Sequence, residues 1–171
     1  MIVMETTFII AELKRNKEVF NSLLKGHRRD LYSWKPAPEK WCLLEIVCHL
    51  YDEEREDFRS RVKHILEQPN KPMPPIHPQE WVSERKYLDW DFELTLTRFL
   101  AERDESIAWL EGLKGAPWGN CYQHPKVGPI SAKMILTNWA AHDLLHIRQI
   151  TATKYKYLDS SGEDLGYAGT W

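Results

Sequence analysis

Two histidines, four residues apart, are the residues best suited to chemistry in this chain. They lie in the segment NWAAHDLLHIRQ, residues 138–149. Residues four apart lie on one face of a helix, so His142 and His146 point the same way, and Asn138 and Gln149 continue that line. The neighbouring apolar stripe is formed by Ile135, Trp139, Leu145 and Ile150. Polar side chains beside a core cost free energy unless they are satisfied, and a metal ion satisfies paired imidazoles.

A third ligand has to come from another helix. His49 stands in the otherwise apolar stretch EIVCHLY, and side chains on facing helices of a bundle meet in the core. Three neutral imidazoles with one or more water positions form an open, reactive site rather than a closed structural one. Imidazole ligands suit zinc, nickel and iron first, and manganese is a further candidate.

Two other interpretations of the histidines stay open at this point. The pair at 142 and 146 fits hydrogen-bonded core residues as well as ligands. The segment HDLLH also approximates the zincin pattern, with Asp143 in the place of the catalytic glutamate. A zincin needs a sheet, which this chain does not predict. The remaining histidines are predicted to be incidental: His27, His64, His77 and His124.

Three polar residues are candidates for a catalytic role beside the ligands. Glu45 and Asp52 lie about one turn on either side of His49, so either one is placed to reach an imidazole N–H or to act as a base, although a solvated helix face explains them too. Gln149 is placed to bind a ligand imidazole or the substrate. Asp143 lies about 100° round the helix from His142 and is expected to face a neighbouring helix.

Apolar residues at helical spacing predict four long helices, and prolines separate them. The helices are expected at 6–29, 41–67, 91–113 and 131–157, with five prolines in the connection 68–90. No strand run is convincing, so the fold class is all-α, a four-helix bundle. The long connection permits the second and third helices to run parallel, which is a crossover topology rather than a simple meander.

The whole chain of 171 residues is predicted to be a single domain, residues 1–171. A net charge of −2 gives no electrostatic case for binding nucleic acid. The start does not resemble a signal peptide, no long apolar run predicts a membrane span, and three cysteines without a zinc or disulfide pattern suit a reducing cytoplasm. In the glycine-rich tail, Tyr167 and Trp171 are placed to dock over the bundle mouth or a partner.

Two motifs together resemble a known family. Trp41-x3-Glu45-Ile46-x2-His49-Leu50-x-Asp52 is followed much later by His142-x3-His146-x-Arg148-Gln149-Ile150. This order and spacing resembles the DinB-like superfamily, which includes the DinB/YfiT-type proteins, bacillithiol S-transferases and mycothiol-dependent maleylpyruvate isomerase. The resemblance implies an up-down-down-up bundle with a three-histidine divalent metal site at His49, His142 and His146. It covers nearly the whole chain.

The resemblance also implies a small-molecule reaction. One expectation is S-transfer from a low-molecular-weight thiol, because a cation stabilises a bound thiolate. A second is metal-dependent hydrolysis with water as the nucleophile. A third is a non-enzymatic module that binds a ligand or a partner around a structural ion. A homodimer is expected because relatives form dimers and because broad aromatic faces favour them.

Overall fold

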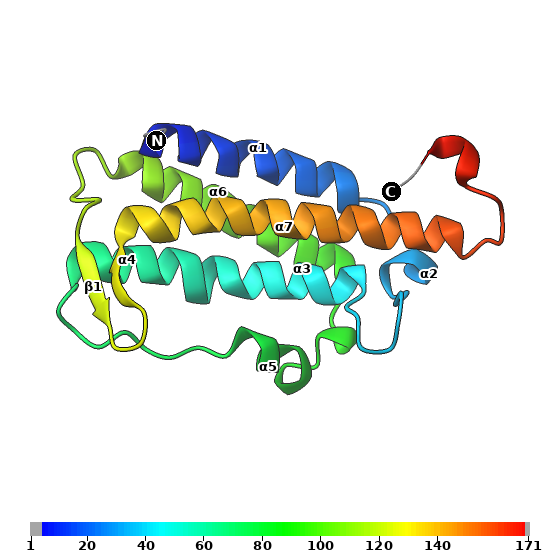
Figure 1. Cartoon of the computed structure of the whole chain (residues 1–171), viewed down its shortest axis with the longest axis horizontal. Helices are drawn as coiled ribbons and strands as arrows, with labels where there is room; N and C mark the ends of the chain where they lie inside the picture. Colours follow the sequence, from blue (N-terminus) through cyan, green and yellow to red (C-terminus); the bar gives the residue numbers. More distant parts are fainter. Residues whose placement is uncertain (1–4, 170–171) are drawn as a thin grey trace.

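The computed structural model describes residues 5–169. Four helical rods lie side by side along the long axis of the molecule (Figure 1): α1 (Thr6–Leu24), the continuous run of α3 (Leu43–Asp52), η1 (Glu53–Phe58) and α4 (Arg59–Glu67), then α6 (Phe92–Gly112) and α7 (Ala132–Asp159). The first and last rods run one way, and the two middle rods run the opposite way. The predicted all-α four-helix bundle with up-down-down-up topology is therefore confirmed.

The helix ends follow from local chemistry. The Asp91 side chain accepts a hydrogen bond from the Leu94 amide at 2.7 Å, and Ser131 accepts one from the Met134 amide at 3.0 Å. These N-caps begin α6 and α7 within a residue of the predicted starts. The first helix ends earlier than predicted, at Leu24, because Gly26 takes a positive φ of 76° that no helix tolerates. A short helix, α2 (Arg29–Tyr32), follows.

The second rod contains a π-helical turn that the sequence pattern did not predict. A π turn holds an extra residue, so the helix faces on its two sides are offset from each other. Asp52, Glu53 and Glu54 are all buried here, at 0%, 6% and 1% exposure. The alternative of a solvated helix face for Glu45 and Asp52 is wrong, because both are buried, at 3% and 0% exposure, and bind polar partners inside the protein.

The long connection between the middle rods is anchored rather than loose. It carries α5 (Pro78–Glu84) and the short turn η2 (Tyr87–Asp89), and it runs alongside α3 in Figure 1. The Tyr87 hydroxyl donates to Asp52 at 2.8 Å, and Arg85 pairs with Asp52 at 2.7 Å. These contacts hold α5 against the bundle, where it forms one wall of the site described below.

A small antiparallel hairpin lies between α6 and α7 where only irregular chain was predicted. Strands β1 (Cys121–His124) and β2 (Gly128–Ser131) pair from Cys121 with Ser131 to His124 with Gly128. Gly128 takes a positive φ of 81° at the turn. Four-residue strands have too little alternation to be recognised from sequence.

The C-terminal tail forms a single turn, η3 (Gly166–Ala168). Tyr167 is fully exposed there, so its predicted docking over the bundle mouth is wrong. Trp171, the other residue of that prediction, lies outside the described residues. None of the helices in the part of the chain that the structure describes has both the length and the low polarity needed to cross a bilayer.

The last rod, α7, turns apolar residues both inward and outward. Trp139 and Ile150 are buried as predicted. Leu145, which belongs to the apolar stripe predicted beside the core, is 54% exposed, and Met134 is 48% exposed. The apolar residues of α7 therefore spread over more of its circumference than the core can cover.

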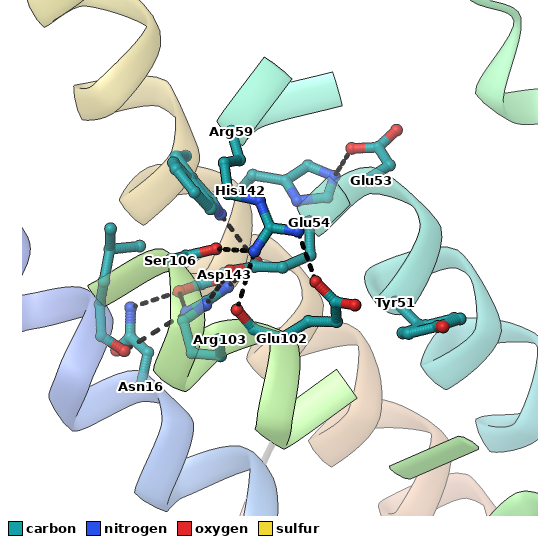
Figure 2. Close-up of polar contacts among 12 residues, drawn as sticks. Asn16, Tyr51, Glu53, Glu54, Arg59, Glu102, Arg103, Ser106, His142 and Asp143 are labelled. Carbon is teal, nitrogen blue, oxygen red and sulfur yellow. Dashed lines mark hydrogen bonds and ion pairs between the residues drawn. The ribbon is translucent and has the colours of Figure 1, made fainter. Parts of the chain in front are cut away.

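A buried ion cluster joins all four rods (Figure 2). Arg103 of α6 pairs with Glu54 of η1 at 2.8 Å and with Asp143 of α7 at 2.7 Å, and all three side chains are about 1% exposed. Asn16 of α1 donates to Asp143 at 3.1 Å, and the Trp139 indole donates to Glu54 at 3.0 Å. Burial works to lower the pKa of Arg103, but the two carboxylates outweigh it and raise that pKa, so the guanidinium stays charged.

Replacing Arg103 with methionine is expected to lower the free energy of unfolding by about 3–5 kcal/mol, because Glu54 and Asp143 would remain buried without their cation. Urea unfolding followed by circular dichroism measures this change. Lys17→Met is the control, because it breaks the ion pair to Asp104, which is 62% exposed; its expected cost is below about 1 kcal/mol. Equal costs for the two variants would contradict the role given to the buried cluster.

Candidate metal centre

The three predicted ligands converge. His49 of α3 faces His142 and His146 of α7, and one ligand nitrogen of each lies within 4.8 Å of the others. The Nε2 atoms of His142 and His146 are 3.1 Å apart, and the ring centroids of His49 and His146 are 4.9 Å apart. Three imidazoles at this spacing can share one ion with little movement.

All three imidazoles are neutral at ordinary pH. Burial, helped by the two neighbouring histidines, lowers the pKa of His49 to about 2. Burial, with His146 and Arg103, lowers the pKa of His142 to about 3. Burial also lowers the pKa of His146, against an opposing hydrogen bond to Gln149. Neutral imidazole is the form that binds a metal, so protons do not compete for this site near pH 7.

Gln149 sets the orientation of one ligand. Its carboxamide oxygen Oε1 lies 2.9 Å from Nδ1 of His146. That oxygen only accepts hydrogen bonds, so Nδ1 donates and Nε2 of His146 keeps its lone pair toward the other histidines. His49 has no such partner, because its Nδ1 atom is buried and makes no hydrogen bond to the described residues.

Glu53 is a site residue that the sequence analysis missed. Its Oε2 atom lies 3.2 Å from Nε2 of His142 (Figure 2), and its Oε1 atom lies 3.6 Å from Nε2 of His49. Burial, with Asp57 adding to it and Arg61 opposing it, raises the pKa of Glu53 to about 8. The available signal was its position one turn after His49, on the same side of the helix.

The histidines open into a pocket of about 500 Å³. The pocket is walled by Trp41, whose ring centroid is 4.8 Å from that of His49, and by Pro78 and Gln79 of α5. Its other lining residues are Glu39, Lys40, Glu53, Gln149 and the three histidines. The crossover therefore forms part of the site, and a small molecule has access to the ligand nitrogens.

The structure does not bring Glu45 or Asp52 to the histidines. Glu45 accepts from the Cys42 amide at 2.9 Å and pairs with Lys35 at 2.7 Å, so it stabilises the start of α3. Asp52 pairs with Arg55 and Arg85 and anchors the crossover. Neither lines the pocket, whereas Gln149 does. A position one turn away along a helix does not determine which neighbouring group a carboxylate binds.

These residues fit a divalent ion. Three neutral imidazoles supply nitrogen ligands, Gln149 fixes one of them, and Glu53 places a carboxylate beside two of them. A cation beside Glu53 would offset the effect of burial and stabilise its charged form. The pocket leaves room for a further ligand, which is the arrangement of reactive rather than structural sites.

Purified chelator-free protein is expected to carry about one ion per chain, because the three imidazoles form one site. Elemental analysis measures the stoichiometry and identifies the metal. His142→Ala is expected to lose the ion, and His64→Ala, at a histidine bonded to the Lys71 carbonyl, is expected to keep it. Failure of added zinc, nickel and manganese to bind would contradict the assignment of the three histidines as metal ligands.

Gln149→Leu is expected to weaken metal binding about 10- to 100-fold, since it removes the group that orients His146. Competition with a chromogenic chelator gives the dissociation constant. Arg148→Leu is the matched control, because the neighbouring side chain is exposed and lies off the pocket. An unchanged affinity in Gln149→Leu would show that His146 needs no such support.

Comparison with known proteins agrees with the architecture. No curated protein sequence matches the chain. The structure resembles that of YfiT from Bacillus subtilis, with a TM-score of 0.79 at 17% identity, over 92% of this chain and 90% of that one. YfiT is described as a probable metal-dependent hydrolase with an unusual four-helix bundle topology. The sequence model of the DinB superfamily matches residues 12–150, a stretch that holds all three histidines, and the chain therefore belongs to the DinB superfamily.

Proposed function

We propose that this protein is a metal-dependent hydrolase that acts on a small molecule at His49, His142 and His146. The observation that carries the proposal is Glu53, a buried carboxylate 3.2 Å and 3.6 Å from nitrogens of two of these histidines. A hydrolase needs a base at the point where water is activated, and Glu53 is the carboxylate placed there. The description of YfiT supports the same reaction class.

Each residue of the site has its own role in the proposed reaction. A divalent ion held by the imidazoles would lower the pKa of water and polarise a carbonyl group. Glu53 accepts the proton of the attacking water and returns it to the leaving group. Gln149 holds the His146 ring in place, and Trp41 shields one side of the pocket from solvent.

Thiol S-transfer is the second candidate. A volume of about 500 Å³ is much larger than a water molecule requires and falls in the range of small-molecule sites. In that reaction Glu53 would take the proton of a low-molecular-weight thiol, the thiolate would attack an electrophilic carbon, and the displaced leaving group would take the proton from Glu53. The two reactions need the same ligands and the same base, and they differ only in the nucleophile.

A non-enzymatic role for the ion fits less well. A structural ion is enclosed by four protein ligands. Here the three histidines line a pocket of about 500 Å³, so a small molecule has access to an ion held by them. The open geometry supports catalysis over a purely structural ion.

Glu53→Gln is expected to keep the metal but to lower the hydrolysis rate about 10²- to 10⁴-fold, because the amide cannot accept the proton. The assay follows a panel of aryl esters and small amides with the metal-loaded protein, with and without low-molecular-weight thiols. Glu84→Gln, at an exposed position at the end of α5, is the control. Products that carry the added thiol would assign S-transfer instead. Full hydrolytic activity in Glu53→Gln would remove Glu53 from the mechanism.

A further inference from the structure

A second hollow adjoins the histidine pocket. It has a volume of about 390 Å³ and lies between the second rod and α7, with β2 at its rim. Its lining residues are Asp57, Phe58, Arg61, Ile130, Met134, Ile135, Asn138, Ala141, His142 and Leu145. We call it the side groove. His142 lines both the side groove and the histidine pocket, so a single ligand imidazole separates them.

The surface of the side groove is apolar where a ligand would touch it. Phe58, a lining residue that is 9% exposed, contacts His142 with ring centroids 5.0 Å apart. Met134 and Leu145 are 48% and 54% exposed, so half of each side chain is open to solvent. Exposed apolar groups that line a hollow gain free energy when an apolar group covers them.

The polar residues of the side groove already have partners within the protein. Arg61 and Asp57 form an ion pair one turn apart on the second rod. The Asn138 amide donates to the Met134 carbonyl of its own helix at 2.8 Å. The charges of Asp57 and Arg61 thus balance each other, and the Asn138 amide group is bonded to its own helix. The side groove thus favours a hydrocarbon group over a polar one, in contrast to the histidine pocket with Glu39, Lys40, Glu53 and Gln149.

We propose that the substrate is amphipathic, with its reacting polar group at the three histidines and an aliphatic or aryl group in the side groove against Phe58, Ile135 and Leu145. The proposal rests on the proposed function and adds the substrate class to it. Both hollows are lined by the His142 ring, so a chain attached to a group bound at the histidines has one imidazole ring to pass before it enters the side groove. Both volumes lie in the range that small-molecule sites occupy.

The test uses protein loaded with cobalt and a series of straight-chain hydroxamic acids from acetohydroxamic to octanohydroxamic acid. The visible spectrum of cobalt reports binding of the hydroxamate head without any need for turnover. The dissociation constant is expected to fall about two- to fourfold for each methylene added until the side groove is filled.

Leu145→Asp and Leu144→Asp form a matched pair, because the two leucines are adjacent and are 54% and 58% exposed, while only Leu145 lines the side groove. Leu145→Asp is expected to remove the gain from chain length and to leave acetohydroxamic acid binding unchanged. Leu144→Asp is expected to behave as the wild type. Ala141→Trp, which places a large ring in the side groove, is expected to have the same effect as Leu145→Asp.

The outcomes separate this proposal from the proposed function. Failure of cobalt to bind would overturn the proposed function, and the substrate class would fall with it. Tight binding of cobalt and acetohydroxamic acid without any effect of chain length would overturn the substrate class alone. A wild-type dimer that Leu145→Asp dissociates, again without an effect of chain length, would assign the side groove to a second copy of the chain and also overturn the proposal.

Discussion

Arg103 forms buried ion pairs with Glu54 and Asp143, and these pairs fix how the helices of the bundle are turned toward one another. A guanidinium cannot give up its charge inside a protein, so its position fixes where the two carboxylates have to lie. Glu54 directly follows Glu53 in the chain, and Asp143 directly follows His142. The ion cluster therefore sets the rotation of both helices about their axes, and that rotation turns His142 and Glu53 toward each other at 3.2 Å. A core of apolar residues alone would hold the rods together but would tolerate small rotations more readily.

The π turn after Asp52 gives three successive acidic residues three different tasks. Asp52 binds Arg85 and Tyr87 of the crossover, Glu53 faces the histidines, and Glu54 pairs with Arg103 in the core. In a regular α-helix, neighbouring side chains point about 100° apart, and one of the three would be expected to reach solvent. Because all three are buried, this one turn joins the crossover, the site and the bundle core. The same turn therefore positions both Glu53 and α5, which forms one wall of the pocket.

Features with a repeating sequence pattern could be predicted, whereas features that depend on a single tertiary contact could not. Apolar spacing predicted the rods, Ser131 predicted the start of α7, and the four-residue histidine spacing predicted the ligand pair. Glu53 was missed because a charged residue on a helix is normally solvated, and only its tertiary neighbours show that it is buried. Glu45 and Asp52 were equally plausible site residues from their positions in the sequence. Each instead pairs with a nearby cation that the spacing of the sequence does not reveal. The short hairpin has no repeating pattern. Leu145 is apolar like a core residue, but its position leaves it half exposed.

The charges of the buried groups around the site also indicate which charge a bound ion should have. Arg103 carries one positive charge against the two negative charges of Glu54 and Asp143, so the buried cluster has a surplus negative charge directly behind His142. Glu53 adds a second negative charge whenever it is ionised, and its pKa of about 8 shows how strongly burial opposes that form. The three histidines contribute no charge, because burial keeps them neutral. A divalent cation between the imidazoles would balance both negative charges, whereas a monovalent cation would leave one of them uncompensated in a medium of low dielectric constant. The same cation would hold Glu53 ionised, which is the form that the proposed hydrolysis requires.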